Sequence, residues 1–159
     1  MLKTLFLPLL LALSAPAATA QTDCARPVVK LLRNKQEIPD SGSALFAAVT
    51  LRVAPAAGCP AQQYRFRNAE ISLIRGGRPA LPTLLASQPR LDLSDFMRAY
   101  QSGDHLLVFI AYQNLAVVAP DGSLQPYVPA KPKKANANKI DLKTDDSKGI
   151  GFKWPLTKP

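Results

Sequence analysis

Prolines limit the fold of this chain more than any other feature. The chain has 15 of them. Proline lacks a backbone N–H and interrupts the interior of a helix, so frequent prolines leave little room for long helices. The spacing instead predicts short strands separated by turns. The positions that carry this pattern are 27, 39, 55, 60, 79, 82, 89, 120, 126, 129 and 132.

Apolar stretches between these breaks give the expected strands. Tyr64-Arg65-Phe66-Arg67 alternates aromatic and charged residues, as a half-exposed strand does. The alternation slips by one residue between Asn68 and Ile71, which predicts a β-bulge there. Arg75-Gly76-Gly77-Arg78-Pro79 predicts a hairpin tip. The expected strands cover residues 28–32, 44–53, 64–73, 81–86, 105–112, 115–118 and 124–128.

One short helix is expected over residues 96–100. Asp92 or Ser94 would cap its N-terminus, and Gly103 would end it. Many turns, short strands and a single helix predict an all-β fold. We expect a small immunoglobulin-like β-sandwich of seven or eight short strands.

The N-terminus carries the features of an export signal. Lys3 precedes an apolar run over residues 5–13, and Ala18-Thr19-Ala20 supplies the small residues of a cleavage site. The alternative, a retained membrane anchor, needs about 20 apolar residues. We therefore predict a signal peptide over residues 1–20, cleaved after Ala20. The exported chain would be periplasmic or secreted, and not membrane-spanning.

Cys24 and Cys59 are the two cysteines of the chain. In an oxidising compartment an even pair predicts a disulfide. Such a bond would close the loop between residues 24 and 59, and for a loop of that length it stabilises a fold by ~3–4 kcal/mol. Two free thiols or a metal pair are the alternatives, but His105 is the sole histidine, so a zinc site lacks ligands.

Charge divides the chain into two parts. Its formal net charge is +9, and residues 126–159 hold eight lysines, three aspartates and no arginine. This composition predicts a β-sandwich domain over residues 21–129 and a lysine-rich tail over residues 130–159. The tail would attach the protein to an anionic polysaccharide or lipid surface through Lys131, Lys133 and Lys134. The alternative is that these lysines are only solvated.

The tail ends in an apolar pattern. Ile150, Phe152 and Trp154 stand at alternate positions, which fits a strand. Residues 149–154 would either dock on the sandwich or remain an exposed motif. Trp154 is a candidate contact residue if the motif is exposed.

Few residues suggest catalysis. Ser102 and Asp104 flank His105, which allows a secreted hydrolase as an alternative, but sequence neighbours rarely have the geometry of a catalytic triad. Asp92 and Asp95 fit helix capping better than an acid–base or calcium site. We therefore expect no enzyme, no catalytic residue, no metal and no cofactor.

Arginines supply the other candidates. Arg75 and Arg78 flank a glycine pair that would bind an anion or form a plain hairpin turn. Arg65 and Arg67 interleave with aromatic residues, as in some nucleic-acid-binding sheets. The expected export argues against a nucleic-acid partner.

The order of features over residues 64–127 resembles a known family. Tyr-Arg-Phe-Arg-Asn-Ala-Glu-Ile-Ser-Leu-Ile-Arg-Gly-Gly-Arg-Pro at 64–79 is followed by Gly103-Asp104, an apolar strand and Ala119-Pro120-Asp121-Gly122. This order is similar to the C-terminal domain of GldM-type proteins, which serve gliding motility and type IX secretion in the bacterial periplasm. The resemblance implies a β-sandwich without enzymatic activity that contacts other proteins. We expect an exported, non-enzymatic binding or structural module whose partner is a cell-envelope protein.

Overall fold

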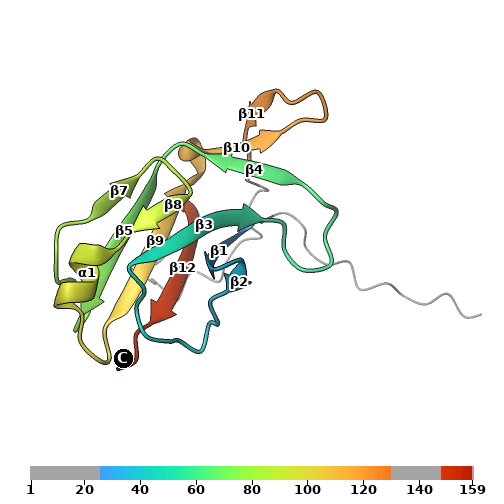
Figure 1. The fold of residues 1–159 in the computed structure, drawn as a ribbon. Coiled ribbons are helices and arrows are strands. Elements are labelled where there is room, and N and C mark those ends of the chain that lie inside the picture. Colours follow the sequence, from blue (N-terminus) through green and yellow to red (C-terminus); the bar gives the residue numbers. More distant parts are fainter. Residues whose placement is uncertain (1–25, 130–147, 159) are drawn as a thin grey trace, which may run out of the picture.

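The fold is built almost entirely from antiparallel strands (Figure 1). The computed structural model describes residues 26–129 and 148–158. These residues form 12 strands, one α-helix and one 3₁₀ helix. The all-β sandwich expected from the sequence is confirmed. The strands outnumber the seven or eight predicted because several have two or three residues, too few for an alternating pattern.

The first sheet has the order β2-β1-β3-β8. Its two long strands pair in register from Val28 opposite Ala54 to Leu32 opposite Thr50. Alternate residues of the longest strand are buried, so one face meets the core and the other meets solvent. The strands are β1 (Val28–Arg33), β2 (Gln36–Glu37), β3 (Ala48–Ala54) and β8 (Arg90–Asp92).

The second sheet has the order β12-β9-β5-β6, and β7 also pairs with β5. Its edge strand β12 comes from the predicted tail and pairs along its whole length with β9. Residues 149–155 are therefore part of the sandwich. Of the two alternatives for residues 149–154, docking is the one observed. The strands are β5 (Ala69–Arg75), β6 (Arg78–Pro79), β7 (Leu84–Ala86), β9 (His105–Ala111) and β12 (Gly149–Pro155).

The core lies between these two sheets. Trp154 of β12 is its largest fully buried side chain, with 0% exposure. Its ring packs at 5.7 Å from that of Phe46, and its Nε1 donates to Ser43 Oγ at 3.1 Å. Buried aliphatic side chains from both sheets fill the rest of the core. They include Leu31, Leu51, Ile71, Leu73, Leu91, Leu106, Val108 and Ile110.

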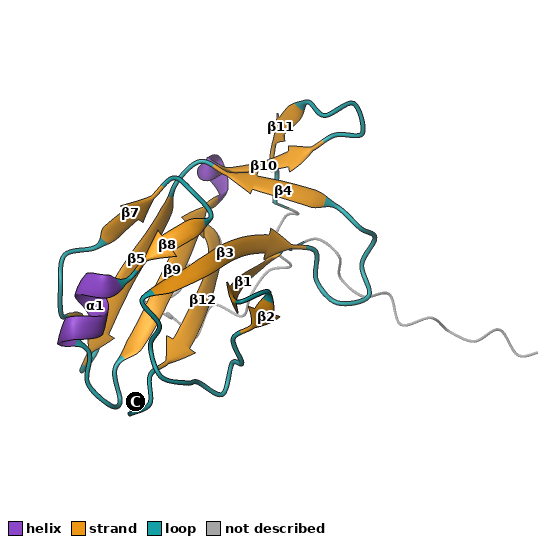
Figure 2. Cartoon of the chain, viewed as in Figure 1, coloured by secondary structure: helices purple, strands orange, loops and turns teal. Residues whose placement is uncertain are grey.

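A third sheet, with the order β11-β10-β4, extends from the sandwich, and we call it the arm (Figures 1 and 2). The predicted strand over residues 64–73 is divided here, because β4 pairs with β10 whereas β5 pairs with β9. The predicted bulge is therefore wrong: the phase slip marks a change of sheet. The elements are β4 (Gln63–Phe66), the 3₁₀ helix η1 (Tyr112–Asn114), β10 (Leu115–Val118) and β11 (Leu124–Pro126).

The helix α1 spans Ser94–Ala99 and packs Phe96 into the core. The Asp92 carboxylate accepts hydrogen bonds from the Ser94 backbone N–H at 3.0 Å and from its hydroxyl at 2.6 Å. The N-cap position is held by Leu93, which makes no side-chain cap hydrogen bond. Neither expected cap, Asp92 or Ser94, is therefore correct: Asp92 lies one residue too early and forms a turn with Ser94, the first residue of the helix. The helix ends at Ala99, before Gly103. No helix in the described part of the chain has the length and hydrophobicity that a membrane span requires.

Candidate functional site

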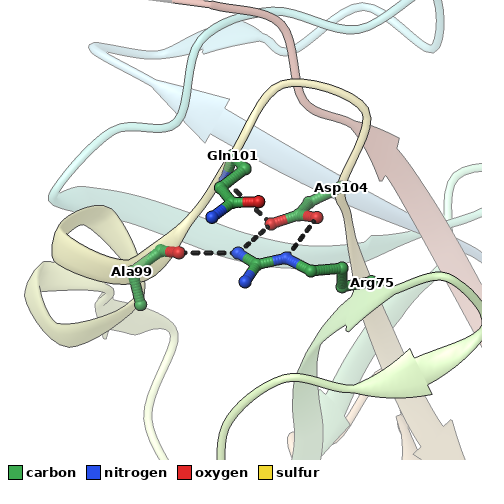
Figure 3. A network of polar contacts seen from close by, with 4 residues as sticks. All are labelled: Arg75, Ala99, Gln101 and Asp104. Carbon is green, nitrogen blue, oxygen red and sulfur yellow. Dashed lines mark hydrogen bonds and ion pairs between the residues drawn. The ribbon is translucent and has the colours of Figure 1, made fainter.

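Arg75 and Asp104 form a polar network with Ala99 and Gln101 (Figure 3). Arg75 Nε donates to Asp104 Oδ1 at 3.0 Å, and Arg75 Nη2 donates to Asp104 Oδ2 at 2.8 Å. The same Nη2 also donates to the Ala99 carbonyl at 2.7 Å. The backbone N–H of Gln101 donates to Asp104 Oδ2 at 2.8 Å. The network joins the end of β5 to the segment between α1 and β9.

These contacts give Arg75 a structural role. Asp104 is 4% exposed, and a carboxylate buried this far requires hydrogen bonds to remain charged. The Arg75 hydrogen bonds lower the pKa of Asp104. Arg78 is exposed on β6, beyond the predicted hairpin turn, where Gly76 and Gly77 both have positive φ. The predicted anion site at Arg75 and Arg78 would therefore have to compete with Asp104.

The acid that the hydrolase hypothesis pairs with His105 has other partners. Asp104, the acid of that hypothesis, directs both oxygens to Arg75 and Gln101. Asp95 is paired with Arg98 on α1, at 2.8 Å. No group of three or more metal-ligating side chains occurs within residues 26–129 and 148–158.

The other candidate residues lie either in the core or outside the described part of the chain. Trp154 is fully buried, so it supports the core and presents no surface for a partner. Lys131, Lys133 and Lys134 lie outside the described residues, as do the expected signal peptide and Cys24. No free cysteine occurs among the residues described, and the Cys24–Cys59 pairing stays a prediction.

A groove between β3 and β4 is the feature best suited to binding. It has a volume of about 450 Å³ and opens where the first sheet and the arm diverge. β8 pairs with β3 only as far as Thr50, so the second half of β3 faces β4 without a strand between them. The groove is lined by Thr50, Leu51, Arg52, Val53, Pro55, Gln62, Gln63, Tyr64, Arg65, Phe66, Ser87 and Pro89.

Two arginines give this groove its charge. Arg52 lies on β3 and Arg65 on β4, and both are exposed. Neither guanidinium group has a hydrogen bond or an ion pair with another described residue. The described residues that line the groove include no aspartate or glutamate. The groove is therefore cationic, and its guanidinium groups are available to an anionic ligand.

The groove continues along β4 into a second hollow. That hollow has a volume of about 710 Å³ and lies between the loop before β4 and the turn after β10. Pro55, Gln62, Gln63 and Tyr64 line both spaces, so the two adjoin. The second hollow has no charged side chain among its described lining residues. Together the two hollows form an elongated depression beside β4.

Aromatic packing supports the wall of this depression. The ring of Tyr64 meets that of Tyr127 at 6.2 Å in an edge-on arrangement, and Tyr127 packs on Tyr112 at 5.4 Å. Burial raises the pKa of both Tyr64 and Tyr127. These contacts join β4, η1 and the end of β11, and they hold β4 in position beside the groove.

No protein-family model, curated protein or solved structure matches this chain.

The sequence predicted one wall of the groove as a strand but did not indicate that it lines a groove. The interleaved Tyr64-Arg65-Phe66-Arg67 segment pointed to a half-exposed strand, which β4 is. Arg52, on the other wall, stands outside any motif, and its alternation with the buried Leu51 and Val53 was the only available signal. Nothing in the sequence indicates that residues 52 and 65 line one groove.

Proposed function

We propose that this protein is an exported, non-enzymatic module that binds a cell-envelope protein through the groove between β3 and β4. The observation that supports the proposal is the pair of arginines, Arg52 and Arg65, on opposite walls of a groove with no acidic side chain among its described lining residues. Arginine is favoured at protein interfaces because its planar guanidinium binds carboxylates in a bidentate manner.

The form of the groove also supports a binding role. One wall, β3, alternates buried residues facing the core with exposed ones, and the other, β4, contacts the core through the partly buried Tyr64 and Phe66. Both walls are therefore formed by strands and not by loops alone. Its size lies within the range of ordinary ligand-binding sites. The expected signal peptide would place the protein among envelope components, and the resemblance to GldM-type domains is a further reason to expect a protein partner.

A cross-linking capture experiment tests this function. The full chain would be exported in its native host and cross-linked to its neighbours in intact cells, and the captured proteins would be identified by mass spectrometry. We expect one envelope protein to be recovered repeatedly with the wild type and at least tenfold less with Arg65→Glu. Arg78→Glu is the matched control, because it reverses an exposed arginine that lies away from the groove.

Two results would contradict the proposal. Capture of no protein in repeated experiments would argue against a protein partner. Equal capture by the Arg65→Glu variant, with loss in the Arg78→Glu variant, would move the binding surface to the β5–β6 hairpin.

A further inference from the structure

We infer that the groove between β3 and β4 binds an extended, acidic segment of the partner, with its carboxylates bound by Arg52 and Arg65. The inference rests on the proposed function and names the chemistry of what the groove takes. It is carried by the charge of the groove, by its shape and by the backbone groups that β4 turns toward it.

Charge selects an acidic ligand. Arg52 and Arg65 approach the groove from facing strands, and neither is neutralised by a described neighbour. The next strand adds Arg90, which stands opposite Thr50 on the solvent-facing side of the first sheet. Carboxylates bound by guanidinium groups form charge-assisted hydrogen bonds, which are about twice as strong as neutral ones.

The backbone of β4 favours a peptide. The Arg67 N–H donates to the Asn114 carbonyl at 2.7 Å, so the odd-numbered residues of this strand direct their backbone groups toward β10. Tyr64 and Phe66 therefore direct theirs toward the groove. β4 has no ladder partner on that side among the described strands. An extended chain that lies along a strand edge can use such groups, and its side chains then reach the flanking pockets.

The shape of the groove disfavours a flat surface or a sugar chain. A bilayer is planar, and the arginines stand on the two walls of a concave space. Sugars are commonly bound by exposed aromatic faces, whereas the Tyr64 ring packs against Tyr127 and both Tyr64 and Phe66 pack on the core. The adjoining hollow along β4 gives the groove the elongated form that an extended peptide requires.

Binding of defined probes to the full exported chain tests the inference. The probes are an eight-residue peptide that alternates glutamate with serine, the same peptide with glutamine in place of glutamate, polygalacturonate, and vesicles of phosphatidylglycerol. Affinities would be measured by isothermal titration calorimetry at two salt concentrations. We expect the glutamate peptide to bind at least tenfold more tightly than the glutamine peptide, and more weakly at high salt.

Variants locate the site. We expect Arg52→Glu and Arg65→Glu each to weaken binding of the glutamate peptide at least tenfold, while Arg78→Glu leaves it within twofold. Unchanged circular dichroism of each variant would show that the fold is kept. Amide chemical shifts of Val53, Tyr64 and Phe66 should move on binding, whereas those of the β5–β6 hairpin should not.

Each contrary outcome has a distinct meaning. Equal binding of both peptides, preferential binding of polygalacturonate or vesicles, or indifference to the Arg52 and Arg65 variants would overturn the inference. The proposed function would survive those results if cross-linking still captured an envelope protein. Failure of the capture experiment, with selective binding of the glutamate peptide, would overturn the proposed partner and leave the groove chemistry standing.

Discussion

Asp104 shows how one buried charge organises the region around it. Its carboxylate accepts hydrogen bonds from Arg75 Nε, Arg75 Nη2 and the Gln101 N–H, all at 3.0 Å or less. Leaving a buried charge without these partners would be costly. The side chain thereby connects the end of β5 to the turn that precedes β9, two segments that are 29 residues apart in the sequence.

We predict that Asp104→Asn lowers the free energy of unfolding at neutral pH by about 2 kcal/mol, the scale of hydrogen bonds to a charged group. The folded-state pKa of Asp104 is lowered, by the Arg75 hydrogen bonds above all. Its contribution is therefore complete above the unfolded pKa of about 3.9 and is lost as the pH falls through the folded pKa. Urea unfolding at pH 7 and at successively lower pH measures this difference.

Asp95→Asn is the matched control for this prediction. Asp95 also pairs with an arginine, Arg98, but its side chain is 87% exposed. An exposed pair of this kind contributes roughly 0–1 kcal/mol. An Asp104→Asn effect as small as that of Asp95→Asn, or one that does not shrink in acid, would show that the buried network is not stabilising.

At the scale of elements, β12 supplies both an edge strand of the second sheet and the fully buried Trp154. Its seven residues pair with β9 from Gly149 opposite Ala111 to Pro155 opposite His105. The loop before β3 meets its far end, where the Ser43 N–H donates to the Pro155 carbonyl at 3.2 Å. Gly42 permits this approach, because a Cβ there would lie 2.5 Å from that carbonyl oxygen. The strand closes one edge of the core.

We predict that a chain truncated after residue 147 fails to fold, because it loses Trp154 from the core and an entire edge strand. Removal of a buried tryptophan side chain alone costs about 3–5 kcal/mol, a large share of the stability of a small domain. Far-ultraviolet circular dichroism during thermal unfolding measures the result.

The control keeps the chain length and changes only charge. Replacing Lys131, Lys133 and Lys134 by serine should leave the unfolding temperature within a few degrees of the wild type. A cooperative transition in the truncated chain would contradict the role assigned to β12. Attachment of the tail to anionic surfaces is therefore better tested by the lysine substitutions than by deletion of residues 130–159.

At the scale of the molecule, the two packed sheets and the arm differ in how deeply their strands are buried. In β9 every second residue is buried, as expected for a strand inside a sandwich. In β11 all three residues are exposed, and β4 has no fully buried residue. Fewer buried apolar contacts predict a lower free energy of local opening for the arm.

We predict that backbone amides of the arm exchange with solvent faster than those of β5 and β9. Hydrogen exchange of the native protein, read residue by residue, measures this order. Arg67 and Tyr127, whose amides donate within the arm, should exchange before Leu73 and Val108. Equal protection in the arm and the sandwich would show that the two open as a single unit.

Local patterns in the sequence were enough to predict the class of fold. Frequent prolines excluded long helices. Alternation located β4 and β5, and a continuous apolar run located β9, to within a few residues. The glycine pair before Arg78 predicted its hairpin because both positions require positive φ. The short strands β2, β6 and β8 were not predicted, because two or three residues contain no period. The division of residues 64–73 between two sheets was not predicted either. Alternation shows that a segment is a strand, but it does not show with which strand the segment will pair.

The sequence by itself determined that this chain forms an antiparallel sandwich of short strands, because turn residues and side-chain alternation act locally. Only the tertiary structure decided what its arginines do. Arg75 became a structural partner of Asp104, whereas Arg52 and Arg65 came to face one groove. Trp154 was likewise placed in the core by the pairing of β12 with β9. Those outcomes depend on contacts between segments that are distant in the sequence. The order of strands in the sheets decides which segments meet, and no local pattern in the sequence gives that order.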